Sequence, residues 1–309
     1  MSHIQIGWTE YPPEDFRRGA VTVGNFDGVH LGHRALVAGA KRWSETVGGP
    51  CVVVTFDPPP QAVLNPDPTK QPLTTLEQRA SLLHEAGADH VVTLKTVPGL
   101  LALSPEAFFE DVLVRQLGAK AIIEGADFRF GRKRSGDIEL LKRLCRANEM
   151  QCDVVTPVLI AGEIVSSSRI RNALLAGRVN DASELLGRLF SIRGTVVEGA
   201  KRGRTLGFPT ANLDGVETIV PAIGVYAMRA TVNGITWPAA ANIGPNPTFG
   251  DEARKIEIHL IGFSGDIYGS EMKAEFVARI RETKPFAGIE ALKTQLQNDI
   301  ETAGTLLKV

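Results

Sequence analysis

The first 160 residues alternate between strand-like and helix-like segments, and this alternation limits the possible folds more than any other feature. Strands separated by helices form a parallel sheet that is covered by helices on both faces. The sequence therefore predicts an α/β domain in which ligands bind beyond the carboxyl ends of the strands. The expected strands are short β-branched runs at 21–24, 51–56, 90–94, 120–124 and 152–158.

Beyond residue 186 the pattern changes, because strands dominate the rest of the chain. Many short strands with Gly and Pro turns predict a small antiparallel β-barrel, and Asn233-Gly234 is typical of a hairpin turn. We expect two domains, at 1–186 and 187–309. The barrel strands are expected at 190–197, 224–232, 235–243, 255–263 and 271–280. A terminal helix should pack on the barrel through Ile289, Leu292, Leu296 and Ile300.

Composition narrows the class of protein. The chain has 309 residues, a net charge of −1 and no basic excess that would attract nucleic acid or an anionic membrane. Its three cysteines, Cys51, Cys145 and Cys152, lack metal-binding spacing. We see neither a signal peptide nor a membrane-spanning run. We therefore expect a cytoplasmic protein without nucleic-acid or membrane partners; the sequence does not indicate its oligomeric state.

The stretch GNFDGVHLGH at 24–33 joins a strand to a helix through glycines. The free N–H groups and the dipole at a helix N-terminus favour a phosphate group. His30 and His33 lie on one side of the first helical turn, where both can donate to phosphate oxygens, and Gly32 lets a phosphate approach the backbone. Two alternatives remain open. One histidine caps the helix while the other lies at the surface, or the pair binds a metal ion, although no third ligand is evident nearby.

The histidine stretch resembles a known family. HLGH resembles the HxGH signature of the nucleotidylyltransferase superfamily, and GNFDGVHLGH is similar to its FMN adenylyltransferase branch. VSSSRIR at 165–171 resembles the I-S-S-T-x-x-R motif that closes over ATP phosphates, and GADFRFGRKRSGD at 125–137 resembles a segment that lines the flavin and nucleotide site. The resemblance implies a Rossmann-like domain in which the FMN phosphate attacks the α-phosphorus of ATP, releasing pyrophosphate without a covalent enzyme intermediate.

The same resemblance assigns residues to this reaction. It implies catalytic roles for His30, His33 and Arg171. It implies contacts to nucleotide or flavin from Gly24, Asn25, Phe26, Asp27, Gly28, Gly32, Asp127, Phe128, Ser167 and Ser168. The chain departs from the family at TFDPPP, where Pro59 replaces the usual histidine and removes a possible hydrogen-bond donor, and at Ser168, which replaces a threonine.

A second motif lies in the strand-rich half, at GAKRGRTLGFPTANL (199–213). Basic, Gly-rich loops suit phosphate, and Thr and Asn oxygens suit Mg²⁺, although a bare loop of this kind is usually only a loop. The run resembles the riboflavin kinase signature G-R-x-x-G-F-P-T-A-N, and NIGPNPTFG (242–250) resembles that family's next loop. The resemblance implies binding roles for Gly203, Arg204, Gly207, Pro209, Arg281 and Phe286, and Mg²⁺ ligation by Thr210 and Asn212.

Glu257 in IEIHL resembles the catalytic base of the same family. A carboxylate there can accept the proton of the ribityl 5′-hydroxyl as that oxygen attacks the γ-phosphate of ATP. From the alternation of residues along the strand alone, Glu257 is expected to point outward into solvent.

Together these resemblances span about residues 15–303 and imply the bifunctional bacterial riboflavin kinase/FAD synthetase family. The implied substrates are riboflavin, FMN and ATP, with Mg²⁺. Two rival hypotheses exist. The N-terminal half could adenylylate pantetheine phosphate or nicotinamide mononucleotide, which the attached kinase-like module disfavours because it makes the flavin substrate. The chain could instead be a flavin-binding regulator, which the two phosphate-handling loops disfavour.

Overall fold

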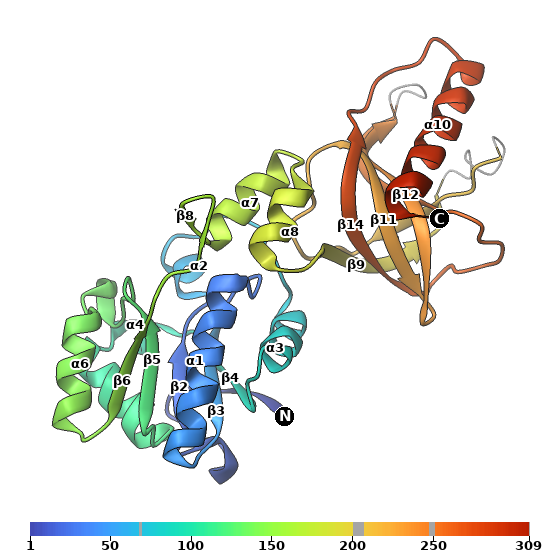
Figure 1. The fold of residues 1–309 in the computed structure, drawn as a ribbon. Helices are drawn as coiled ribbons and strands as arrows, with labels where there is room; N and C mark the ends of the chain where they lie inside the picture. Colours follow the sequence, from blue (N-terminus) through green and yellow to red (C-terminus); the bar gives the residue numbers. More distant parts are fainter. Residues whose placement is uncertain (68–69, 200–206, 247–250, 309) are drawn as a thin grey trace. The chain divides into compact units, whose positions relative to one another are not determined.

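The computed structural model describes residues 1–67, 70–199, 207–246 and 251–308. The chain forms two compact units (Figure 1). The first unit comprises Met1–Lys70 and Thr74–Ser166, and the second comprises Gln71–Leu73 and Ser167–Val309. The division into functional domains after residue 186 stays a prediction.

The first unit is built on a six-stranded, all-parallel sheet with the order β1-β4-β3-β2-β5-β6. All five predicted strands are present, which confirms the predicted α/β architecture. The first strand, β1, was not predicted; it is short, half-exposed and pairs with β4 at one edge. The strands are β1 (Ser2–Ile6), β2 (Ala20–Val23), β3 (Cys51–Asp57), β4 (His90–Lys95), β5 (Ala121–Gly125) and β6 (Gln151–Val155).

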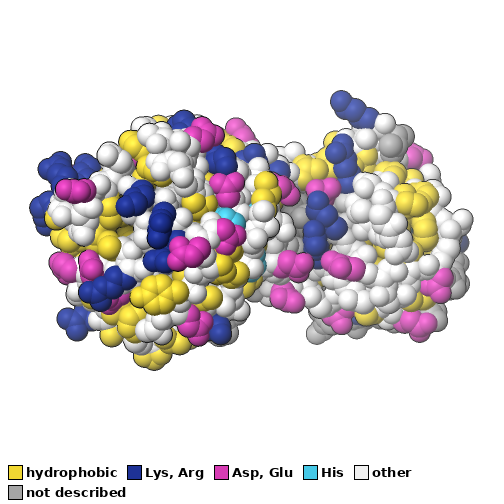
Figure 2. All heavy atoms as spheres, turned by 90° about the horizontal axis from the view of Figure 1, so that it is seen from below, with side chains coloured by type: hydrophobic (Ala, Val, Ile, Leu, Met, Phe, Trp, Pro, Cys, Tyr) yellow, Lys and Arg dark blue, Asp and Glu magenta, His cyan; other side chains and the backbone are white. Residues whose placement is uncertain are grey.

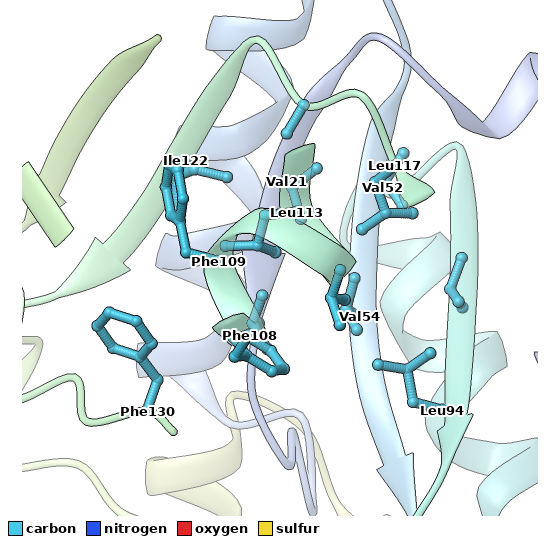
Figure 3. Packing of buried hydrophobic residues seen from close by; sticks show 14 of the residues in the cluster. Val21, Val52, Val54, Leu94, Phe108, Phe109, Leu113, Leu117, Ile122 and Phe130 are labelled. Carbon is cyan, nitrogen blue, oxygen red and sulfur yellow. The ribbon is translucent and has the colours of Figure 1, made fainter. Parts of the chain in front are cut away.

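Hydrophobic clusters cover both faces of this sheet. On one face, Val21, Val52 and Val54 pack with Phe109 and Leu113 of the helical segment before β5 (Figure 3). The other face packs against α1. The helical elements are η1 (Glu14–Phe16), α1 (Leu31–Val47), α2 (Pro60–Leu64), α3 (Leu76–Glu85), α4 (Pro98–Ala102), α5 (Pro105–Phe108), the π-helix η2 (Phe109–Gln116), η3 (Arg132–Arg134) and α6 (Ile138–Ala147).

Side chains cap the starts of α3 and α5. Thr75 and Gln78 form both hydrogen bonds of a capping box on α3. The Ser104 hydroxyl accepts a hydrogen bond from the Ala107 N–H at 3.1 Å, at the start of α5. A two-strand hairpin of β7 (Leu159–Ile160) and β8 (Glu163–Ile164) ends the first unit.

The second unit holds a closed, antiparallel six-stranded barrel with the order β10-β13-β12-β11-β14-β9, as predicted. Asn233 and Gly234 have φ values of 50° and 77°, the signs that a type I′ hairpin requires. The elements are α7 (Ser167–Leu175), α8 (Val179–Leu186), β9 (Phe190–Val197), β10 (Ala211–Asp214), β11 (Gly224–Val232), β12 (Ile235–Asn246), β13 (Asp251–Leu260), β14 (Glu271–Arg281) and α10 (Ile289–Leu307).

The terminal helix α10 packs on the barrel mainly through its second half. Ile300, Ala303 and Leu307 meet Ala227 and Ala240 of the barrel. Ile289 is 51% exposed, so the first turn of the expected apolar face does not pack.

Charges of both signs are mixed on the face of the molecule that Figure 2 shows. Figure 2 shows Lys and Arg side chains interspersed with Asp and Glu side chains on one face, in keeping with the net charge of −1. None of the helices in the described ranges has the length and apolar content that crossing a membrane requires.

One buried carboxyl group lies where the connections of the parallel sheet reverse direction. β2 and β5 pair only through Ala20 with Ala121 and Val21 with Ile122. Beyond these pairs, the Val23 N–H donates to Glu124 Oε1 at 2.6 Å, so a side chain replaces the next backbone acceptor. Glu124 is 2% exposed. Burial raises its pKa well above the usual value; the Val23 N–H lowers the pKa, and nearby Cys152 and Asp127 raise it.

This pKa shift predicts how stability depends on pH. In the unfolded chain Glu124 ionises near 4.5, whereas the folded chain retains the proton to higher pH. Stability is therefore lost as pH rises above 4.5, by about 1.4 kcal/mol per pH unit, until the folded carboxyl ionises. Because Glu124→Gln removes this loss, the difference between its thermal midpoint and that of wild type should grow as pH rises above 4.5. Exposed Glu139→Gln is the control, and parallel curves for E124Q and wild type would contradict the assignment.

Candidate functional site

The turn between β2 and α1 has a strained backbone. Phe26, Gly28 and Val29 have φ values of 47°, 84° and 39°. Such values cost non-glycine residues on the order of 1–3 kcal/mol each, and they are least accessible to a β-branched residue such as valine. The Phe26 and Val29 side chains are each 1% exposed and belong to the cluster beneath α1. Core packing therefore offsets the strain and holds the turn in one shape.

His30 and His33 lie together at the start of α1. Their rings stack with centroids 3.6 Å apart, so the spacing correctly predicted a shared side. His30 is the N-cap residue, as one alternative predicted, and its Nδ1 accepts a hydrogen bond from the His33 N–H at 3.3 Å. In neutral His30 the proton is therefore on Nε2. Among the described residues, no three His, Cys, Asp or Glu side chains are grouped to hold a metal ion. Phosphate contact by either histidine stays a prediction.

The side chain of Asp27, a residue of this turn, is buried. Its buried carboxylate accepts hydrogen bonds from the Thr74 N–H at 3.2 Å and the Thr74 hydroxyl at 3.3 Å. Arg79 Nη2 lies 3.7 Å from the same carboxylate oxygen. The sequence analysis assigned no role to Thr74 or Arg79, and their only signal was their position beside a helix cap. The predicted role of Asp27 in nucleotide binding remains untested.

Two glycines let aromatic rings lie against this backbone. A Cβ added to Gly24 would come within 3.2 Å of the Phe26 ring, and one added to Gly32 within 3.2 Å of the His30 ring. Larger residues at these positions would push the rings away. The glycines therefore help to shape the turn, whatever they contribute to ligand binding.

The ADFRFG segment places one predicted residue at the surface and another against the core. Asp127 is exposed, whereas the ring of Phe128 stacks on Phe130 at a centroid distance of 5.5 Å. Phe130 belongs to the hydrophobic cluster of the sheet, so Phe128 is held by the core. Pro59, the departure from the family motif, directly precedes α2.

Ser167, Ser168 and Arg171 belong to the second unit, in which α7 begins at Ser167. Arg171 is four residues beyond Ser167, so the two lie on the same side of the helix. The Arg171 Nε donates to the Gln71 carbonyl at 3.3 Å. Contacts of these three residues with ATP stay predictions.

A row of polar residues crosses three strands of the barrel. Glu257 of β13 is directly opposite Asn212 of β10 and Asn242 of β12. Opposite residues of antiparallel strands lie about 5 Å apart on the same face of the sheet. The structure thus brings together the predicted base and a predicted Mg²⁺ ligand, and it adds Asn242 beside them.

His259 anchors the PTAN segment to the same strand. Its Nδ1–H donates to the Pro209 carbonyl at 2.7 Å, directly before half-buried Thr210. The edge of the Phe208 ring faces His259 at a centroid distance of 6.1 Å. Sequence analysis missed His259, although the alternation in IEIHL places it on the same face as Glu257. Exposed Gly207 has a φ of 91°, and the predicted Gly203 and Arg204 lie outside the described residues.

Arg281 and Phe286, which are predicted to help bind flavin or nucleotide, lie together. The Arg281 guanidinium carbon is 5.7 Å from the centre of the Phe286 ring. Arg281 Nε and Nη2 donate to the two carboxylate oxygens of buried Asp299 at 2.8 and 2.7 Å. Gln295 donates to the same carboxylate at 2.9 Å. α10 therefore fixes the orientation of Arg281, whereas flavin contact stays a prediction.

Comparisons with known proteins match both halves of the chain. The family model described as FAD synthetase matches residues 13–169, and the one described as riboflavin kinase matches residues 186–307. The structure described as a macrolide-efflux protein from Streptococcus pneumoniae has a TM-score of 0.89 and 31% identity, covering 97% of this chain and 98% of its own. Other relatives carry a description that differs from that of this structure and agrees with both family models.

Three of these relatives are described as bifunctional riboflavin kinase/FMN adenylyltransferase. The protein from Pseudomonas fluorescens is 38% identical, covering 94% of this chain and 93% of its own. Those from Escherichia coli K12 and Bacillus subtilis are each 36% identical, covering 92% and 94% of this chain and 91% and 93% of their own. With FAD synthetase and riboflavin kinase regions in this order, the chain belongs to the family of bifunctional riboflavin kinases/FMN adenylyltransferases.

Proposed function

We propose that the chain phosphorylates riboflavin to FMN in its C-terminal half and adenylylates FMN to FAD in its N-terminal half, using ATP in both steps. The main support is that each matched family region holds one of the two groups of residues that the sequence predicts to bind phosphate. The histidine pair at the start of α1 lies in the FAD synthetase region. The Glu257–Asn212 pair lies in the riboflavin kinase region.

In the kinase step, Glu257 accepts the proton of the ribityl 5′-hydroxyl as that oxygen attacks the γ-phosphorus of ATP; the bond to the β–γ bridging oxygen breaks and ADP leaves. Thr210 and Asn212 offer a hydroxyl and an amide oxygen, hard donors that suit Mg²⁺. The Asn212 amide packs so closely on Gly199 that a Cβ there would overlap it, which fixes the amide's place beside Glu257. Bound by these two residues, Mg²⁺ would offset the charge of the ATP phosphates. Gly203, Arg204, Gly207 and Pro209 would contact ATP, and Arg281 and Phe286 the flavin.

In the adenylyl-transfer step, the chain supplies orientation and charge, and no covalent intermediate is needed. His30 Nε2–H, His33 and the first N–H groups of α1 hold the ATP phosphates. Arg171, Ser167 and Ser168 contact the phosphates as well. A phosphate oxygen of FMN attacks the α-phosphorus of ATP, and pyrophosphate leaves. Asp127 and Phe128 line the flavin and nucleotide site.

The time course of product formation tests the overall proposal. With riboflavin, ATP and Mg²⁺, FMN should appear first and FAD later, as separated by chromatography. FMN accumulating without FAD would contradict the adenylylation step, and recovery of FAD in Pro59→His would trace the defect to that departure. A flavin-binding regulator would quench flavin fluorescence and form neither product.

Glu257→Gln should slow FMN formation by about 10²–10⁴-fold, because it removes a general base of that typical contribution. FAD formation from added FMN should remain, since the change lies in the kinase region. The matched control is Glu271→Gln, at an exposed position on β14. Normal FMN formation by E257Q would remove Glu257 from the mechanism.

His30→Asn should slow FAD formation from FMN by about 10²-fold, comparable to the loss of one transition-state hydrogen-bond donor. Asparagine is a good N-cap, so this change keeps the cap of α1 while removing the imidazole. Riboflavin phosphorylation on the same chain reports on folding and should be unchanged. Loss of both activities at an unchanged thermal midpoint would refute the separation into two sites.

A further inference from the structure

Arg79 is a buried cation beneath the turn between β2 and α1. It lies in the first turn of α3 and is 4% exposed. Its Nη1 donates to the Thr55 hydroxyl at 3.4 Å, and its Nη2 lies 3.7 Å from Asp27 Oδ1. Arg79 thus contacts one residue of β3 and one residue of the turn itself.

Two threonine hydroxyls extend these contacts to the turn's backbone. The Thr55 hydroxyl, which accepts from Arg79, donates to the Asn25 carbonyl at 3.1 Å. The Thr74 hydroxyl donates to Asp27 at 3.3 Å and accepts from the Gly28 N–H at 3.2 Å. A hydroxyl can donate and accept at once, so four side chains and two backbone groups form one connected network. The network therefore reaches the turn on both sides of strained Phe26.

The position of Arg79 is itself fixed by the start of α3. The Arg79 N–H donates to the Thr75 carbonyl at 2.9 Å, and Thr75 forms the capping box with Gln78. A capped helix start is a rigid support. Strained backbone persists only where the surroundings over-determine it, and this network supplies polar constraints in addition to the packing of Phe26 and Val29.

We propose that Arg79 is a positioning residue for adenylyl transfer, which fixes the Asn25–Gly28 backbone through Thr55 and Asp27. This inference rests on the proposed function of the N-terminal half. Arg79 supports the turn from beneath. The groups of α1 that are proposed to bind phosphate follow directly after the turn in the chain. A displacement of those groups by about 1 Å can cost 10²-fold in rate.

The test compares Arg79→Met with wild type at temperatures well below the variant's thermal midpoint. FAD formation from FMN should fall about 10²-fold in kcat/KM, while riboflavin phosphorylation on the same chain stays unchanged. Arg79→Lys keeps the charge without the planar fork and should recover only part of the rate. Arg115→Met, at an exposed arginine of η2, is the matched control. Wild-type adenylylation by folded R79M would overturn the proposal.

Thr55→Val tests the pathway of the effect. It removes the link to Asn25 in a side chain of similar shape and should also slow FAD formation. Because both residues act through one network, T55V/R79M should lose little more than R79M alone. Multiplying losses would show independent effects and overturn the proposed pathway.

Amide hydrogen exchange separates this inference from the proposed function. In R79M, the amides of residues 24–30 should exchange faster than in wild type while those of β4 keep their rates. Unchanged exchange in the turn would overturn the positioning role even if activity fell. Absence of FAD formation by wild type would instead refute the proposed function, and the exchange result would still decide the role of Arg79.

Discussion

The turn between β2 and α1 is the constraint on which the N-terminal half depends. β2 lies inside the sheet between β3 and β5, and α1 packs on one of its faces, so both ends of the turn are held. In between, Phe26 and Val29 adopt left-handed backbone with their side chains in the core. The shape of this helix N-terminus, the predicted phosphate site, is therefore determined by apolar packing as much as by polar residues.

In the second unit, the register between strands positions the predicted site residues. β10 has only four residues, yet it pairs with both β13 and β9 and so closes the barrel. Asn212 of that strand is also the residue opposite Glu257. Barrel closure and the placement of Asn212 beside Glu257 thus depend on the same short segment. The last three residues of the motif, 211–213, are therefore part of the sheet.

The sequence predicted the strands that are β-branched runs and missed β1 and β10, for a physical reason. β3 and β4 are β-branched runs that can be recognised in a local window. β1 and β10 have five and four residues, and each depends on pairing with a distant strand, as Ser2 pairs with His90. Local spacing contains no information about such a partner.

The candidate sites likewise contain some residues that local spacing predicts and others that it does not. Spacing alone placed His30 beside His33, because their contact is within one helical turn. Arg79 gave no such signal, because an arginine in an amphipathic helix normally faces solvent. Its burial makes sense only with Asp27 and Thr55, which come from other elements. Two acceptors in different directions suit the planar fork of a guanidinium and not the single ammonium of a lysine. The type of residue at 79 is thus explained by three-dimensional contacts that no local pattern encodes.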